Sequence, residues 1–341
     1  MSEAGTGAGG GGRASHDDAA GGGGRADHDD AAGGGASERP ADPEAVRATL
    51  AAHGYLADEG LATAVFLALA LDRPLLLEGQ AGVGKTELAK VLAASTGGRL
   101  LRLQCYDGID VAQAAYEWDY PRQLLHLRAA EARATAGGAT LGTEVEDELY
   151  SERFLVRRPL LAALAGRPDQ PAPVLLIDEI DRADDEFEAF LLEVLSDHAM
   201  TVPELGTVAA TVPPVVVMTS NRTRDLHDAL RRRCLYHWVE HPDFDREVAI
   251  VLRRAPAAGE SLARQVSAAV DRMRGMGLRK PPGVAETIDW AVAVAALGRA
   301  RLDTPTVDAT LGVVVKDRDD ADRVRHAGIG SLVDAALERA G

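Results

Sequence analysis

The chain has 341 residues, of which 46% are hydrophobic, enough for an α/β core and a smaller helical domain. Its formal net charge is −16, so its surface should repel polyphosphate backbones, and we expect no nucleic-acid partner. The two cysteines, Cys105 and Cys234, lack CxxC and histidine spacing, which argues against a disulfide framework and a metal site. The longest apolar stretch, residues 61–71, is too short to span a membrane, and no signal core opens the chain. We therefore expect a cytoplasmic protein without a membrane span.

The first 41 residues have a composition of their own. Residues 9–20 and 21–32 are near-copies, GGGGRASHDDAA and GGGGRADHDDAA. Such glycine, alanine and aspartate segments cannot bury a core, so we predict a disordered tail over residues 1–41. The His-Asp-Asp triplet of each copy is alternatively a weak ligand for a divalent metal. The sequence Asp42-Pro43-Glu44 then predicts the start of the first helix.

A glycine-rich loop follows the first predicted strand. The apolar residues 75–77 precede the loop GQAGVGKT, and a helical pattern follows it. In that setting the loop matches the GxxxxGK[ST] pattern of a P-loop, whose backbone N–H groups and following helix surround a phosphate. Lys85 would reach the β- and γ-phosphates, and the hydroxyl of Thr86 would bind Mg²⁺.

Residues 174–177, VLLI, predict a strand that is buried on both faces and ends in two carboxylates. Ligands bind at the carboxyl ends of such strands. Asp178 would hold the Mg²⁺, and Glu179 would take a proton from an attacking water. The acidic stretch 181–186 reads as the solvated start of a helix. The expected nucleotide-contacting residues are Gly79, Gln80, Ala81, Gly82, Val83, Gly84, Lys85, Thr86, Glu87 and Asp178.

A third buried strand, residues 215–220, ends at Asn221, which could orient the attacking water. Three consecutive arginines, residues 231–233, end the short helical segment that follows. One of them, Arg232 or Arg233, would serve as an arginine finger on a neighbouring subunit. An arginine triplet is alternatively a cluster of cations at a helix C-terminus.

Four aromatic residues, Tyr106, Tyr116, Trp118 and Tyr120, follow the second predicted strand in a chain that is otherwise poor in aromatics. They fit either a surface that grips a partner protein or ordinary packing. The turn 203–206 predicts a hairpin before the third buried strand, and Trp238 and Trp290 are expected to be structural. Beyond residue 242 the pattern is helical throughout.

This ordered set of motifs resembles the AAA+ ATPases, with Walker A and Walker B motifs, a sensor asparagine and arginines. Further blocks resemble the MoxR-like branch, closest to the carbon monoxide dehydrogenase accessory (CoxD-like) subgroup. These blocks are QCYDGID at 104–110, YEWDY at 116–120, VPELGT at 202–207, TSNRTR at 219–224, RCLYHW at 233–238 and PGVAETIDW at 282–290.

The resemblance implies an α/β AAA+ core over residues 42–241, with a parallel sheet of order 5-1-4-3-2 flanked by helices, and an all-α lid over residues 242–341. It implies a Mg²⁺-dependent ATPase that forms a hexameric ring, with Glu179, Asn221 and Arg232 or Arg233 as catalytic residues. The family's lid arginine is not evident, because the region reads RKPPG at 279–283. Whether Arg279 or Lys280 replaces it is open.

The resemblance also implies a chaperone that remodels a metalloenzyme, together with a von Willebrand A-type partner. The expected client is a molybdenum-containing carbon monoxide dehydrogenase. One alternative is a related MoxR-branch activator of another client, of Rubisco, nitric oxide reductase or gas-vesicle type. The others are a nucleotide-gated scaffold with little turnover and a P-loop kinase that phosphorylates a small acceptor. The sequence names neither the client nor the number of subunits.

Overall fold

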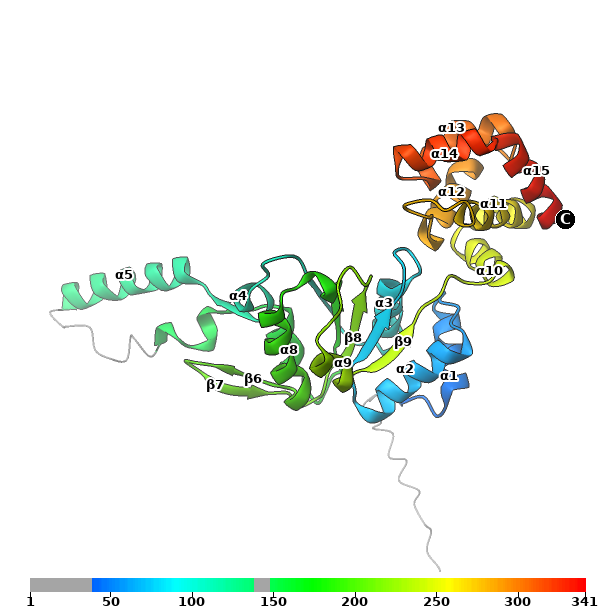
Figure 1. Cartoon of the computed structure of the whole chain (residues 1–341). Coiled ribbons are helices and arrows are strands. Elements are labelled where there is room, and N and C mark those ends of the chain that lie inside the picture. The colour runs from blue at the N-terminus through cyan, green and yellow to red at the C-terminus, as the bar shows by residue number, and fades with distance from the viewer. Residues whose placement is uncertain (1–38, 138–147) are drawn as a thin grey trace, which may run out of the picture. The chain divides into compact units, whose positions relative to one another are not determined.

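Five parallel strands form the central sheet of the computed structural model, which describes residues 39–137 and 148–341 (Figure 1). The sheet order is β2-β5-β8-β1-β9, which confirms the expected order 5-1-4-3-2 when read from the opposite edge. All of its pairings are parallel. The strands are β1 (Leu75–Glu78), β2 (Leu100–Gln104), β5 (Val174–Asp178), β8 (Val215–Ser220) and β9 (Leu235–Trp238).

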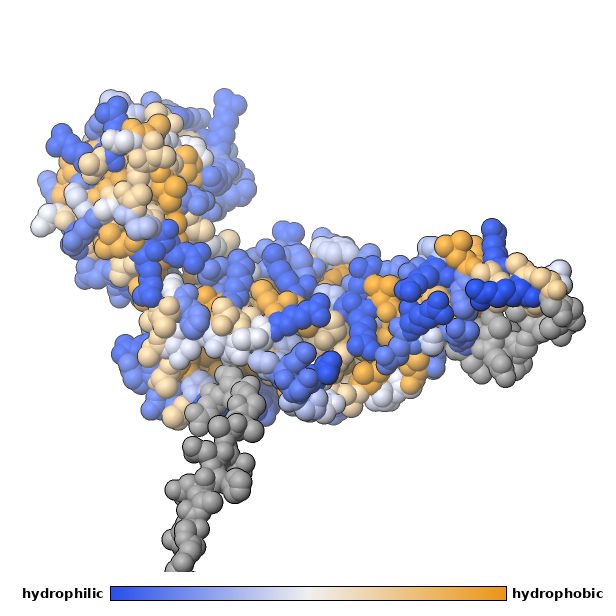
Figure 2. All heavy atoms as spheres, turned by 180° about the vertical axis from the view of Figure 1, so that it is seen from behind, coloured by the Kyte–Doolittle hydropathy of each residue, from blue (hydrophilic) through white to orange (hydrophobic). Residues whose placement is uncertain are grey.

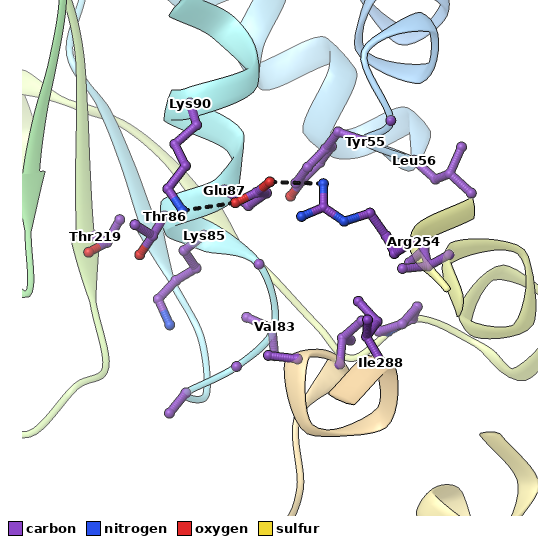
Figure 3. A pocket seen from close by; sticks show the side chains of 18 of the residues that line it. Tyr55, Leu56, Val83, Lys85, Thr86, Glu87, Lys90, Thr219, Arg254 and Ile288 are labelled. Atoms are coloured by element: carbon purple, nitrogen blue, oxygen red, sulfur yellow. Dashed lines mark hydrogen bonds and ion pairs between the residues drawn. The ribbon is translucent and has the colours of Figure 1, made fainter. Parts of the chain in front are cut away.

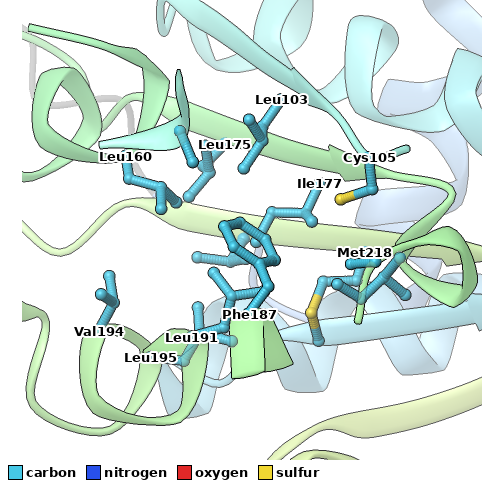
Figure 4. Packing of buried hydrophobic residues seen from close by; sticks show 14 of the residues in the cluster. Leu103, Cys105, Leu160, Leu175, Ile177, Phe187, Leu191, Val194, Leu195 and Met218 are labelled. Atoms are coloured by element: carbon cyan, nitrogen blue, oxygen red, sulfur yellow. The ribbon is translucent and has the colours of Figure 1, made fainter. Parts of the chain in front are cut away.

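The central strands are continuous apolar runs, and successive residues of a strand point to opposite sides of the sheet. Both faces of the sheet are therefore apolar. Leu75 and Leu77 belong to the cluster with α1, α2 and α3, whereas Leu76 belongs to the cluster with α7, α8 and α9. Figure 4 shows the second cluster, in which Phe187 and Leu191 pack against strand side chains. The helices are α1 (Pro43–Ala52), α2 (Glu59–Leu71), α3 (Lys85–Thr96), α7 (Pro159–Leu164), α8 (Asp185–Asp197) and α9 (Asp228–Arg233).

Two antiparallel two-stranded sheets are inserted into this core. One pairs β3 with β4, and the other pairs β6 with β7 around the predicted turn at 203–206. The long helix α5 has two exposed leucines, Leu124 and Leu125. On the face of the molecule seen in Figure 2, apolar residues lie among hydrophilic ones. The inserted elements are α4 (Val111–Ala114), β3 (Tyr116–Trp118), α5 (Tyr120–Gly137), η1 (Glu152–Phe154), β4 (Leu155–Arg157), β6 (Ala199–Val202) and β7 (Gly206–Ala209).

The aromatic residues have different environments. Trp118 is only 5% exposed and packs with Phe154, whereas Tyr120 is 63% exposed. Trp290 is fully buried and donates its indole N–H to Thr310 Oγ1 at 2.8 Å, which confirms a structural role. Trp238 ends the edge strand β9, as expected, but its ring is 38% exposed and the guanidinium of Arg222 lies over it, so its structural role stays a prediction.

The C-terminal residues are helical, as expected, and pack around a buried cluster of their own. The residues that the structure describes make up one compact unit, so the boundary at residue 242 stays a prediction. The predicted tail lies outside the described residues except for residues 39–41. Among the helices that the structure describes, none is long and apolar enough to cross a membrane. The C-terminal helices are α10 (Phe244–Arg254), η3 (Pro256–Ala258), α11 (Gly259–Arg274), α12 (Val284–Ala296), α13 (Thr304–Val314), α14 (Arg318–Ala327) and α15 (Ile329–Ala340).

A buried ion pair joins three of these helices. Both terminal nitrogens of Arg274 on α11 donate to the carboxylate of Glu247 on α10, at 2.7 and 2.8 Å. The hydroxyl of Thr287 on α12 donates to the same carboxylate at 2.7 Å. Glu247 is 1% exposed, so loss of its partner would leave an unpaired charge out of water.

We therefore predict that Arg274→Ala lowers the free energy of unfolding by about 3–5 kcal/mol, the cost of breaking a buried pair. Arg279→Ala is the matched control, because Arg279 pairs with Asp319 at the surface, where such pairs contribute about 1 kcal/mol or less. Urea unfolding followed by circular dichroism measures both. Equal, small losses in the two variants would contradict the prediction.

Candidate nucleotide-binding site

The glycine loop joins β1 to α3 and passes close to other backbone segments. A Cβ on Gly79 would lie 2.4 Å from the carbonyl oxygen of Val239, so only glycine fits there. Gly84 adopts φ +98° at the start of α3, and no described side chain caps that helix. The first N–H groups of α3 are therefore open to an anion.

A pocket of about 340 Å³ lies over this loop, a volume typical of small-molecule sites. Figure 3 shows the lining side chains around the start of α3. Tyr55 forms one wall, and its ring lies 3.7 Å from the position that a Cβ of Gly84 would take. Burial raises the pKa of the Tyr55 phenol, so this wall is uncharged. Of the predicted site residues, the pocket is lined by Ala81, Gly82, Val83, Gly84, Lys85, Thr86, Glu87, Asp178, Glu179 and Asn221.

Lys85 holds the loop and the end of β8 together. Its Nζ donates to the carbonyl oxygens of Gly79 and Gln80 at 2.7 and 2.8 Å, and to Asn221 Oδ1 at 2.9 Å. Burial lowers the pKa of Lys85 to about 8, opposed by nearby carboxylates. A phosphate beside Nζ would favour the charged form of the amine.

Asp178 is buried at the end of β5, and both of its oxygens accept hydrogen bonds. Thr86 and Thr219 donate to Oδ1 at 2.9 and 2.6 Å. Arg102 on β2 donates to Oδ2 through Nε at 3.1 Å and Nη2 at 2.6 Å. Sequence reasoning missed Arg102, although the alternating pattern of β2 beside β5 is a signal for it. Its partner on the sheet is Leu176, two residues before Asp178.

The hydroxyl of Thr86 and the carboxylate of Asp178 are hard oxygen ligands next to the phosphate loop, so they fit Mg²⁺. In the described parts of the chain, no group of three His, Cys, Asp or Glu side chains could hold a metal ion. Mg²⁺ commonly takes one or two protein ligands together with phosphate and water. A cation at this place would therefore depend on the nucleotide for its remaining ligands.

Glu179 follows Asp178 with a strained backbone. Its φ is +54°, in the left-handed region that side-chain-bearing residues rarely adopt. Its N–H donates to Thr219 Oγ1 at 2.9 Å, and Asn221 Nδ2 donates to its Oε1 at 3.5 Å. The strain brings the Glu179 carboxylate beside Asn221 at the pocket wall, where a general base for water would be needed.

Asp181 fixes the loop that carries Asn221. It accepts hydrogen bonds from the N–H groups of Asn221 and Thr223, at 3.2 and 2.8 Å, and from the Thr223 hydroxyl at 2.7 Å. The expectation of a solvated Asp181 is wrong, because this side chain is buried. Its carboxylate accepts hydrogen bonds from the loop in place of those from water. Residues 184–186 are exposed, as expected.

The three arginines of α9 do not share one environment. Arg231 pairs with the buried Glu78 at 3.5 Å, and its guanidinium lies over the ring of Tyr236. Arg232 and Arg233 are exposed and lie outside the pocket that contains Glu179. The structure therefore does not bring them together with the other predicted catalytic residues in one chain.

The cations of the helical region that reach the pocket differ from those that the sequence suggested. Arg279 pairs with Asp319, and neither Arg279 nor Lys280 lines the pocket. Arg246 and Arg254 on α10 do line it, and Arg254 pairs with Glu87 on α3 at 3.1 Å. Sequence reasoning missed both, although basic residues on one amphipathic helix gave a weak signal.

Comparison with known proteins gives the family of the core. Residues 74–234 match the family model described as AAA domain (dynein-related subfamily). Two solved point mutants of RuvB from Thermotoga maritima are each 16% identical, with TM-scores of 0.44 and 0.42. Their alignments cover 82% and 83% of this chain and 72% and 74% of theirs. No curated protein sequence matches the chain. Residues 74–234, with their phosphate loop and the buried strand that ends at Asp178, are thus an AAA domain of the dynein-related subfamily.

Proposed function

We propose that this protein is a Mg²⁺-dependent ATPase of the MoxR-like branch that acts as a chaperone for a metalloenzyme. Support for hydrolysis comes from one observation. The cation, the metal ligands, the base and the water-orienting amide of the hypothesis all line the same pocket. Those residues are Lys85, Thr86, Asp178, Glu179 and Asn221.

In this proposal the free N–H groups of α3 and the Nζ of Lys85 bind the phosphates of ATP. Thr86 and Asp178 hold Mg²⁺, which when bound neutralises charge on the β- and γ-phosphates. Glu179 accepts the proton of the attacking water, and Asn221 orients that water. Tyr55, which lines the same pocket, would pack beside the bound nucleotide.

The proposed site is completed by a second copy of the chain. Arg232 and Arg233 are exposed, and neither forms an ion pair with a residue that the structure describes. A guanidinium that reaches a neighbour's γ-phosphate stabilises the charge that develops there during transfer. We therefore infer a ring of subunits, with a hexamer as the expected form.

The chaperone role rests on the sequence blocks that resemble the CoxD-like subgroup. It predicts a von Willebrand A-type partner and a molybdenum-containing carbon monoxide dehydrogenase as client. Tyr120 is the aromatic residue of the YEWDY block that is most exposed, and it is thus the best candidate for a contact with the partner. Trp118 is buried and is not available for such a contact.

The first prediction separates nucleotide binding from hydrolysis. Lys85→Ala should abolish ATP binding because the phosphate loop loses its cation, whereas Glu179→Gln should bind ATP and stop releasing phosphate. Calorimetry measures binding, and a steady-state phosphate assay measures turnover. Near wild-type turnover by Glu179→Gln would rule out Glu179 as the base. Absence of turnover in the wild-type protein would favour the nucleotide-gated scaffold.

The second prediction concerns the exposed arginines. Arg233→Ala should bind ATP normally yet lose turnover by about 10³-fold or more, the scale known for arginine fingers. Mixing it with Glu179→Gln should restore part of the activity, because some interfaces then combine an intact arginine with an intact base. If the mixture stays inactive, the same experiment with Arg232→Ala tests the other candidate, and failure of both excludes an arginine finger in α9.

The third prediction tests the client. Deletion of the gene should leave the carbon monoxide dehydrogenase without a mature active site, and the wild-type gene should restore it, whereas Lys85→Ala should not. Tyr120→Ala should keep basal ATPase activity but fail in this complementation assay. Normal dehydrogenase activity after deletion would contradict the chaperone proposal for this client.

A further inference from the structure

We propose that Arg73 is a positioning residue for the arginines that act on the neighbouring subunit. Arg73 lies between α2 and β1, and its side chain holds the last turn of α9. This inference rests on the proposed function, since it concerns how Arg232 and Arg233 are aimed. Arg73 does not line the nucleotide pocket of its own chain.

The contact consists of two hydrogen bonds to consecutive carbonyl groups. Arg73 Nη2 donates to the carbonyl oxygen of Arg232 at 2.8 Å, and its Nε donates to that of Arg233 at 3.2 Å. Both carbonyls lie in the last turn of a helix, where the helix itself offers no donors. A guanidinium supplies two donors and places a positive charge at the negative end of the helix.

The contact is important for the stability of α9, because this helix has only six residues. A helix this short is not stable by its own backbone hydrogen bonds. The two carbonyls that Arg73 holds belong to the two exposed arginines, so the contact fixes the backbone from which both side chains project. Arg231, the third arginine, is held separately by Glu78.

Arg73 is itself anchored on both sides. Its N–H donates to the carbonyl oxygen of Ala68 at the end of α2, at 3.2 Å. The next residue, Pro74, accepts a hydrogen bond from the N–H of Leu235, at the start of β9, at 2.8 Å. The base of the Arg73 side chain is therefore fixed to the same sheet edge that α9 leads into. We therefore expect the side chain of Arg73 to stay in one position rather than to move freely at the surface.

Arg73→Gln should lower the turnover of ATP by about tenfold to a hundredfold, because a displacement of about 1 Å can cost that much in rate. The affinity for ATP should stay unchanged, since Arg73 is outside the pocket. Mixing Arg73→Gln with Glu179→Gln should restore part of the activity. In such a mixture, an undisturbed arginine of the Glu179→Gln subunit can face the intact base of the Arg73→Gln subunit.

The mixture gives a different result if Arg73 only stabilises its own subunit or acts on the nucleotide site of its own subunit. Every intact base in that mixture belongs to an Arg73→Gln subunit, so a defect within that subunit would persist. Absence of recovery, or a wild-type rate for Arg73→Gln alone, would therefore overturn the proposal. If Arg73→Gln does not fold, Arg73→Lys is read in the same mixture, because lysine keeps the charge but cannot make the paired contact.

Arg47→Gln is the matched control, because Arg47 is an exposed arginine on α1 that pairs with Glu44. It should change neither turnover nor affinity. The mixture of Arg233→Ala or Arg232→Ala with Glu179→Gln separates the two hypotheses. If neither of those mixtures recovers, the proposed completion of the site between subunits fails and the role of Arg73 fails with it. If one recovers and the Arg73→Gln mixture does not, only the role of Arg73 is wrong.

Discussion

The rest of the site depends on the hydrogen bonds that the buried carboxylate of Asp178 accepts. This carboxylate accepts hydrogen bonds from Thr86 at the start of α3, Thr219 on β8 and Arg102 on β2. A carboxylate in this position would be costly without partners, and the partners that offset the cost come from three different segments of the core. The same bonds therefore hold the phosphate loop, the two central strands and the neighbouring strand in one register.

The order of the sheet explains why these groups meet. Strands β5 and β8 are adjacent, and β1 lies on the other side of β8, so their carboxyl ends open at the same edge. At this edge Lys85 reaches Asn221, and Asn221 reaches Glu179. The left-handed backbone of Glu179 is a local strain that the surrounding hydrogen bonds support, as expected at a functional site.

The helical region contacts the phosphate loop through its backbone as well as through Arg254. The N–H of Val284 donates to the carbonyl oxygen of Gly82 at 2.9 Å, and the Cα of Gly82 would lie only 2.7 Å from a Cβ on Gly283. The Arg274–Glu247 pair supports this turn, because Arg274 also donates to the carbonyl oxygen of Pro282. The end of α12 that faces the loop is thus fixed by both charge and close backbone packing.

The sequence by itself determined the elements whose signals are local. The apolar runs of β1, β5 and β8, the glycine loop and the residues directly after each strand all follow from spacing along the chain, and the resemblance supplied the sheet order. Only the tertiary structure decided which partners distant residues found. Arg102 donates hydrogen bonds to Asp178, and Asp181 is buried beneath the Asn221 loop. Trp118 is buried while Trp238 is exposed. Arg254 rather than Arg279 reaches the pocket. The reason is physical: periodicity reports which face of an element is apolar, whereas the pairing of charges and the burial of single side chains depend on how separate elements pack together.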